Sequence, residues 1–214
     1  MFYPLIKRFF DITISICLII ILLPLLVVVS FAIWIEDRGP VFAESPMRIG
    51  KDGKKFFMYK FRSMIPNAYN KLMNDSKYEK KKKESFHHSN KVPCSDELVT
   101  NVGRIIRRTD IDEIPQLLNV IKGEMSLVGP RPSYDDELVR HFKKYPQDKK
   151  IMEEILKIRP GMTGIWQVSG RNMVPLHERL NMEYNYVKHL NLVTDLKIIF
   201  KTPYVIFTRK GVYE

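Results

Sequence analysis

No charged side chain occurs between Ile12 and Ile35, although the rest of the chain is rich in charge. Cysteine is also scarce: Cys17 lies in that apolar stretch and Cys94 in a polar one, so we expect no disulfide between them. This scarcity disfavours a disulfide-stabilised secreted domain and favours a reducing compartment. Internal repeats are lacking too, and 214 residues suit one domain better than two.

Acidic residues are outnumbered by basic ones, with 24 Asp and Glu against 35 Lys and Arg and a net charge of +11. Such a surplus favours an anionic partner, which can be nucleic acid, anionic lipid or a phosphorylated small molecule. We expect no nucleic-acid partner, because the sequence has no base-stacking or recognition-helix pattern. A zinc site at His87 and His88 is not expected, because spaced Cys or His partners are missing around them.

The uncharged stretch predicts a membrane-inserted helix. A helix over residues 12–35 would be roughly 36 Å long at about 1.5 Å per residue, enough to cross the roughly 30 Å hydrocarbon core of a bilayer. A signal peptide has an apolar core of only about 7–15 residues. A buried helix of a soluble domain would show a polar face, which this stretch lacks.

Pro24 stands at the centre of the stretch and leaves two membrane arrangements open. Proline removes a backbone hydrogen bond and clashes with the preceding turn, and each half alone is too short to span. A straight span would put one of the two basic flanks on the non-cytoplasmic side of the membrane, where lysine and arginine are disfavoured. A re-entrant helix that breaks at Pro24 avoids this, although prolines also occur in straight spans. The basic flanks are Lys7 and Arg8 before the stretch, and Arg38, Arg48, Lys51, Lys54 and Lys55 after it.

The segment after this helix predicts a small β-hairpin. Asp52-Gly53 is a typical hairpin turn, and aromatic residues alternate after it over residues 56–61. Period-two alternation puts Lys60 on the face of Phe56 and Met58, from which it can project into a site. A solvated strand lysine is the alternative.

The remaining sequence predicts a polar segment that leaves the core, called the excursion below, together with helices and a loop. Residues 67–101 form a polar, basic excursion with one exposed helix, in which the run Lys80–Lys83 is either a solvated face or a headgroup contact. We expect a helix over residues 137–157 that is interrupted near Pro146, a loop at residues 159–164, and a helix through residues 176–187. Residues 190–213 mix apolar and basic side chains, which fits an interfacial membrane helix or ordinary core packing.

The stretch from Arg107 to Gln116 is the first candidate for chemistry. Thr109 or Asp110 can cap a helix start here, which would place Asp112 and Glu113 at a helix N-terminus. Helix N-termini favour carboxylates and bind phosphate, and Arg107 adds positive charge beside them. This combination suits phosphoryl chemistry, in which cations hold a phosphate while a carboxylate attacks it or binds a metal. The alternative is a capping aspartate beside a surface ion pair.

Arg131 is the second candidate. Pro130 and Pro132 stiffen the backbone on either side of it and limit its orientations. A rigidly held arginine suits a bidentate grip on phosphate.

The order and the amino-acid sequences of these segments resemble those of the bacterial sugar transferases, the monotopic polyprenyl-phosphate phosphoglycosyl transferases. The resemblance covers the chain from about Lys7 to Tyr213. The segment Trp166–Asn172 and the ending Gly211–Tyr213 are similar to the catalytic domains of larger hexose-phosphate transferases, which carry further N-terminal membrane spans. The matching segments are Lys7–Asp11, the apolar run around Pro24, Tyr59–Met64, Asp112–Leu117, Met125–Pro132, Arg159–Gly164 and Gly170–Asn172.

The resemblance implies transfer of a sugar 1-phosphate from a UDP-sugar to polyprenyl phosphate, usually undecaprenyl phosphate, with release of UMP. It implies that Asp112 is the nucleophile and forms an aspartyl-phosphosugar intermediate. Glu113 would hold Mg²⁺, with Mn²⁺ as an alternative ion. The phosphate-binding positions would be Lys60, Arg107, Arg131 and Arg171, and the membrane anchor and break would be Lys7, Arg8 and Pro24.

The expected fold is α+β and mainly helical. Residues 1–38 would form a re-entrant, Pro-broken membrane helix with a headgroup anchor. Residues 39–214 would form a catalytic domain on the cytoplasmic face of the bacterial inner membrane, with a small β-hairpin, interfacial amphipathic helices and the excursion at 67–101.

The pathway implied by the resemblance is the first membrane step of surface glycan assembly: exopolysaccharide, capsule, O-antigen or glycoprotein. Membrane lipids are expected partners, with a homodimer and downstream glycosyltransferases as further expectations. The donor sugar stays open among glucose, galactose and N-acetylated sugars, with a preference for hexose. The alternative from another class is a membrane-tethered basic protein that binds nucleic acid or anionic lipid without catalysis.

Overall fold

The computed structural model describes residues 3–44, 46–78, 96–170 and 174–208. Its longest element is α1, Tyr3–Asp37, which contains the uncharged stretch. Within the described residues, α1 is the one helix long and apolar enough to cross a membrane. Most of its large apolar side chains are exposed, because the rest of the chain covers only part of its surface.

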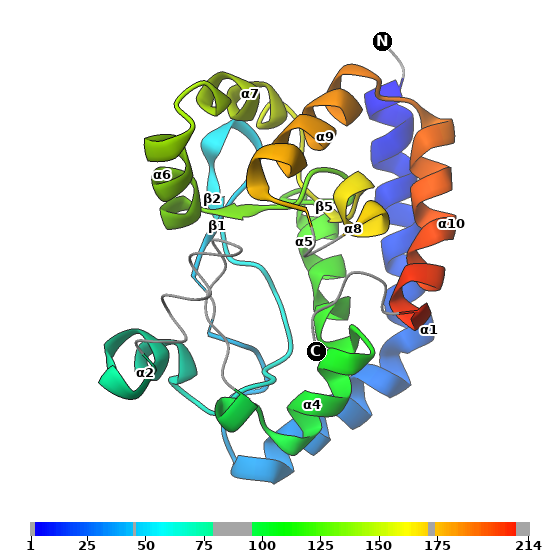
Figure 1. Cartoon of the computed structure of the whole chain (residues 1–214). Coiled ribbons are helices and arrows are strands. Elements are labelled where there is room, and N and C mark those ends of the chain that lie inside the picture. Colours follow the sequence, from blue (N-terminus) through cyan, green and yellow to red (C-terminus); the bar gives the residue numbers. More distant parts are fainter. Residues whose placement is uncertain (1–2, 45, 79–95, 171–173, 209–214) are drawn as a thin grey trace.

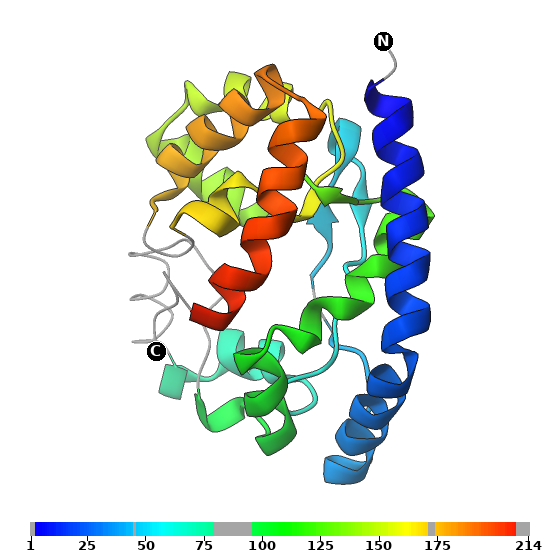
Figure 2. The same ribbon diagram turned by 90° about the vertical axis from the view of Figure 1, so that its right-hand side faces the viewer.

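Pro24 lies inside α1 and does not end it. The expectation that the helix is interrupted at Pro24 is therefore wrong at the level of secondary structure. The axis of α1 instead changes direction past its middle (Figure 2). A proline inside a helix bends it in this way, because it removes one backbone hydrogen bond and crowds the preceding turn.

Two small sheets organise the rest of the chain. The predicted hairpin turn is confirmed: β1, Arg48–Ile49, pairs antiparallel with β2, Lys55–Phe56, around a turn in which Asp52 and Gly53 have φ angles of 56° and 75°. The strand expected over residues 56–61 is wrong beyond Phe56, because β2 ends there. The sequence did not reveal the other pairings. β4, Ser133–Tyr134, adds to β1, and β3, Ser126–Val128, runs parallel to β5, Gly161–Thr163, inside the segment predicted as a loop.

Helices surround these sheets (Figure 1). The predicted interruption near Pro146 is confirmed, because α6 ends before it and α7 begins after it. The helix predicted over residues 176–187 is confirmed as α9. The helices are α2 Ala68–Asn74, α4 Asn101–Arg108, α5 Leu117–Lys122, α6 Asp135–Lys144, α7 Asp148–Ile155, α8 Ile165–Ser169, α9 Leu176–Lys188 and α10 Leu192–Thr208, with short 3-10 turns η1 Lys51–Gly53, η2 Ser76–Tyr78, η3 Asp96–Leu98 and η4 Ile111–Gln116.

The main core lies between α5, the β3–β5 pair and α10, and α1 packs onto it. Val120 and Met125 are completely buried there. Asp11 fixes α1 in place, because its carboxylate accepts hydrogen bonds from Ser126 Oγ (2.7 Å) and from the backbone N–H of Leu127 (3.1 Å). α1 and α10 lie close at their N-terminal ends and diverge from there (Figure 2).

A buried carboxylate joins the N-terminal ends of these two helices. Asp195 of α10 accepts hydrogen bonds from Tyr3 Oη (2.7 Å) and from Tyr186 Oη (2.6 Å), and its Oδ2 lies 2.6 Å from Lys7 Nζ. The side chain of Asp195 is only 5% exposed. α1 is thus attached to the domain by charge and hydrogen bonds as well as by apolar packing.

Candidate active site

Lys60 and Asp112 come together because the chain after β2 crosses η4. The backbone N–H of Phe61 donates to the carbonyl oxygen of Asp112 at 2.9 Å. Lys60, one residue earlier, then lies with its Nζ 2.9 Å from Asp112 Oδ2 and 3.0 Å from Glu113 Oε1. The structure therefore places Lys60 against both carboxylates, and not on a solvated strand face.

The carboxylate pair occupies the first turn of η4, at the junction between α4 and α5. Of the two residues predicted to cap this helix start, Asp110 occupies the N-cap position of η4. Thr109 instead ends α4, and its hydroxyl donates back to the carbonyls of Ile105 and Ile106. Asp110 follows with a φ of 52° and turns the chain into η4. Such a backbone conformation is uncommon outside glycine and is often found at functional sites.

The two carboxylates have different electrostatic environments. Burial raises the pKa of Asp112, and the neighbouring Lys60 ammonium opposes that shift. Burial would also raise the pKa of Glu113, but Lys60 and Arg131 outweigh it and lower the value to about 2. The pair therefore consists of a firmly ionised Glu113 and a more basic Asp112. Such a division is typical of sites where one carboxylate reacts and the other binds a cation.

Arg131 faces the same site from the loop after β3. Its backbone N–H donates to Glu183 Oε1 of α9 at 2.9 Å, and its guanidinium carbon lies 5.2 Å from the centre of the Trp166 ring. Its guanidinium contributes to the low pKa of Glu113. Arg107, at the end of α4, lies close enough to Asp112 to lower the pKa of that carboxyl. Three of the predicted cations, Lys60, Arg107 and Arg131, are thus brought to the carboxylates.

Arg48 is a member of the site that the sequence did not identify. It is buried, its guanidinium carbon lies 3.3 Å from the centre of the Tyr134 ring, and it lines a small pocket with Glu113 and Arg131. Burial lowers the pKa of Arg48 to about 10. Its only sequence signal was its place among the basic residues that follow the membrane stretch.

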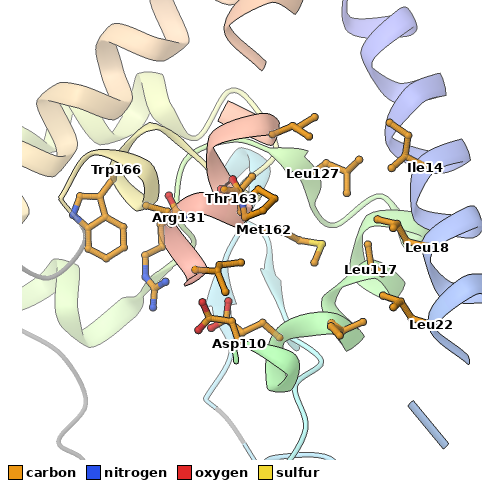
Figure 3. Close-up of a pocket in the computed structure, with 17 residues that line it drawn as sticks. Ile14, Leu18, Leu22, Asp110, Leu117, Leu127, Arg131, Met162, Thr163 and Trp166 are labelled. Carbon is orange, nitrogen blue, oxygen red and sulfur yellow. Dashed lines mark hydrogen bonds between the residues drawn. The ribbon is translucent and has the colours of Figure 1, made fainter. Parts of the chain in front are cut away.

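An apolar cavity of about 480 Å³ opens beside Glu113. Ile14, Leu18 and Leu22 of α1 face into it, as do Leu117 and Met162 (Figure 3). Arg131 and Trp166 lie on the side away from α1. The charged part of its wall is formed by Asp110, Glu113 and Arg131, and α10 contributes Ile199, Thr202, Pro203 and Ile206. The cavity can therefore hold a molecule with an apolar part against α1 and an anionic part at Arg131.

The other predicted positions have different outcomes. Arg171 lies outside the described residues, as do the Lys80–Lys83 run and the His87–His88 pair. Lys7 and Arg8 contact the domain: Lys7 pairs with Asp195, and Arg8 donates to the carbonyls of Val120 and Ile121 at the end of α5. Their contact with lipid headgroups stays a prediction.

Comparison with known proteins decides the family. The model of the bacterial sugar transferase family matches residues 2–209. The chain belongs to the bacterial sugar transferase family. The matched range contains α1, the Asp112–Glu113 pair and all the described helices and strands.

Three relatives within the bacterial sugar transferases show how the chain compares in length. It is 43% identical to an undecaprenyl-phosphate galactose phosphotransferase of Salmonella typhimurium and 32% identical to a UDP-glucose:undecaprenyl-phosphate glucose-1-phosphate transferase of Klebsiella pneumoniae. Each match covers 97% of this chain and 41% of the relative. The exopolysaccharide production protein ExoY of Sinorhizobium fredii is 39% identical, over 97% of this chain and 88% of its own. The chain thus spans about two fifths of the first two relatives and most of the third.

Proposed function

We propose that this protein is a phosphoglycosyl transferase that moves a sugar 1-phosphate from a UDP-sugar to polyprenyl (undecaprenyl) phosphate and releases UMP. The observation that carries the proposal is that Glu113 lines an apolar cavity formed by α1 and α10, while Asp112, its neighbour in the chain, shares the ion-pair partner Lys60 with it. A polyprenyl phosphate combines one apolar chain with one anionic group, and the cavity has an apolar wall that ends at charged side chains. The names of the relatives support the same substrate class.

The chemistry proceeds in two displacements on one phosphorus. A carboxylate oxygen of Asp112 attacks the β-phosphorus of the UDP-sugar, and the bond from that phosphorus to the bridging oxygen breaks, so UMP leaves with the electron pair. A phosphate oxygen of the polyprenyl phosphate then attacks the same phosphorus and releases the Asp112 carboxylate. Covalent catalysis of this kind lets one site use a soluble donor first and a lipid acceptor second.

The cationic side chains make an attack by one anion on another feasible. Lys60 lies against Asp112 and Glu113 (2.9 and 3.0 Å), and Arg131, whose backbone N–H is held by Glu183, lines the same cavity as Glu113. Preorganised positive charge around the diphosphate stabilises the charge that develops during transfer. Asp112 is buried, so water competes poorly with the acceptor phosphate for the intermediate.

The oxygen donors at the site fit a hard divalent cation. Glu113 and Asp110 both line the cavity, and carboxylate oxygens are the preferred protein ligands of Mg²⁺. We propose that Glu113 holds Mg²⁺, or Mn²⁺ in its place. A bound ion of this kind supplies charge neutralisation at the diphosphate.

The contacts of α1 support a re-entrant arrangement on one face of the membrane. Near its start Lys7 pairs with Asp195 at 2.6 Å, and at its end Asp37 pairs with Arg62 at 2.5 Å. Lys7 and Asp37 are 30 positions apart in one helix, which corresponds to about 45 Å, more than the roughly 30 Å bilayer core. A straight span would carry one of these domain contacts to the opposite side. We therefore propose that α1 enters and leaves on the cytoplasmic face and that the catalytic domain lies there.

The exposed side of α10 supports contact with the membrane surface. Val193, Leu196, Phe200, Tyr204 and Phe207 are all exposed, whereas Ile198 and Val205 face the core. Apolar side chains on one side of a helix, with lysines beside them, are typical of interfacial helices. We propose that this side of α10 lies in the headgroup region.

The pathway proposal follows from the product, which is a lipid-linked sugar. Such a product is consumed by glycosyltransferases that extend it, so we place the reaction at the first membrane step of surface glycan assembly. The name of the ExoY relative supports exopolysaccharide as the end product. Non-catalytic binding of nucleic acid or anionic lipid is not favoured, because the family match covers nearly the whole chain.

The decisive experiment measures UMP release from UDP-glucose, UDP-galactose and UDP-N-acetylated sugars with undecaprenyl phosphate and Mg²⁺. We expect release with a UDP-hexose and none for Asp112→Asn. Label from a radioactive donor sugar should stay on the wild-type protein when the acceptor is omitted. Absence of UMP release across the donor panel would contradict the proposed activity.

Two controls make these results specific. Asp135→Asn changes an exposed carboxylate and should react like the wild type, which separates loss of the nucleophile from general effects of the substitution. For topology, cysteines at Phe2→Cys and Glu153→Cys should both react from the cytoplasmic side. Reaction of the Phe2 position from the outer side would show a straight span.

A further inference from the structure

The junction of α6, α7 and α9 contains a cluster of two histidines and one aspartate outside the candidate active site. His141 Nε2 and His177 Nδ1 each lie 2.7 Å from Asp148 Oδ2. Tyr145 stacks on both imidazoles, with ring centres 5.0 Å from His141 and 5.1 Å from His177. None of these residues lines the 480 Å³ cavity, so the cluster is separate from the proposed transfer chemistry.

Asp148 is the unusual member of this cluster. Its side chain is fully buried, and its Oδ1 has no hydrogen-bond partner among the described residues, whereas both histidines converge on Oδ2. Among the residues that the structure describes, the salt-bridge partners of Asp148 are the two imidazoles, and no lysine or arginine pairs with it. A buried carboxylate with an unpaired oxygen is costly unless positive charge compensates it.

A divalent cation would give the Asp148 carboxylate both a bonding partner and the compensating positive charge. The donor atoms of the three side chains all lie within 4.8 Å of one another. Zinc bonds of about 2.0–2.2 Å to imidazole nitrogen and carboxylate oxygen fit such a spacing. Two nitrogens with one oxygen favour zinc over magnesium or calcium, which prefer oxygen ligands alone.

We propose that His141, Asp148 and His177 bind one zinc ion, which joins α6, α7 and α9. His177 is the entry point, because its side chain is 39% exposed while those of His141 and Asp148 are buried. The site would stabilise the domain, because a metal bound only by the folded chain lowers the free energy of the folded state. α9 also carries Glu183, which holds the backbone of Arg131.

The test uses full-length protein without a histidine tag, purified in detergent, and measures bound zinc by elemental analysis and titration. We expect one zinc per chain, retained in the presence of excess Mg²⁺. His177→Asn should weaken binding by about tenfold or more, because loss of a direct ligand costs at least as much as loss of a residue that orients one. His177→Cys should keep the ion, since thiolate is also a zinc ligand.

Controls separate this site from other histidines. His189→Asn changes an exposed histidine at the end of α9, and a double His87→Asn, His88→Asn variant removes the adjacent pair; both should bind zinc like the wild type. Zinc should raise the Tm of the wild type and of His177→Cys, and not that of His177→Asn. Failure of the wild type to bind zinc, or equal binding by His177→Asn, would overturn the proposal. These readouts do not depend on transferase activity.

Discussion

Glu183 of α9 accepts the backbone N–H of Arg131 at 2.9 Å and so fixes the loop that carries this arginine to the candidate active site. Glu183 is itself buried, and Arg179 lies 3.6 Å from it on the same helix. Burial raises the pKa of Glu183, and Arg179 opposes that shift. The position of a phosphate-binding candidate therefore depends on a carboxylate 52 residues away in sequence.

Replacement of Glu183 tests this support. Glu183→Ala leaves the Arg131 N–H and the Arg179 guanidinium without this partner, and breaking a buried ion pair costs about 3–5 kcal/mol. Glu183→Gln keeps an acceptor for the N–H, so we expect it to fold with a raised KM for the UDP-sugar and a smaller change in kcat. Denaturation in detergent and steady-state kinetics check both outcomes. A KM for Glu183→Gln equal to that of the wild type would argue against a positioning role.

The pH dependence of the reaction tests the role of Lys60. Asp112 can attack only as a carboxylate, so activity is lost as pH falls through its pKa, which burial raises above that of an ordinary aspartate. Lys60 lowers this pKa. Lys60→Met should therefore move the acid limb of the kcat/KM profile to higher pH and reduce the rate about a hundredfold at neutral pH.

The control for this experiment is Lys55→Met, which removes an exposed lysine paired with Asp135. Its profile should match the wild type. An unchanged acid limb in Lys60→Met would mean that Lys60 does not set the ionisation of Asp112.

Asp195 tests how α1 is attached to the domain. Asp195→Asn removes the charge that pairs with Lys7 and weakens the acceptor for Tyr3 and Tyr186. Because Asp195 is buried, we expect a loss of about 3–5 kcal/mol in the free energy of unfolding. Lys7→Met should cost less when Asp195 is already changed, so a double-mutant cycle measures the coupling. Lys201→Met, at an exposed position of the same helix, is the control; additive effects of the two substitutions would contradict the pairing.

The exposed side of α10 can be tested in lipid. With Cys17 and Cys94 replaced by serine, an environment-sensitive fluorophore at Phe200→Cys should shift to shorter wavelength in bilayers, because we expect this side in the headgroup region. The same label at Glu153→Cys on α7 should report water. Identical spectra at the two positions would show that α10 does not contact the membrane.

The sequence determined those features that depend on local pattern. The uncharged run specified α1, Asp52-Gly53 specified the hairpin turn, and Pro146 specified the division between α6 and α7, because each follows from backbone preferences or side-chain polarity within a few residues. The sequence motifs around Asp112, Glu113 and Arg131 also identified the family. Thr109 showed the limit of local reasoning, since a residue that suits a helix start ends α4 instead.

Only the tertiary structure decided which distant residues meet. The Phe61–Asp112 backbone bond placed Lys60 at the carboxylates, and Arg48 and Glu183 joined the site from β1 and α9. The parallel β3–β5 pair and the His141–Asp148–His177 cluster likewise depend on contacts between separate elements. Such contacts form because apolar surfaces far apart in the chain are buried together, and the charges carried with them then require partners.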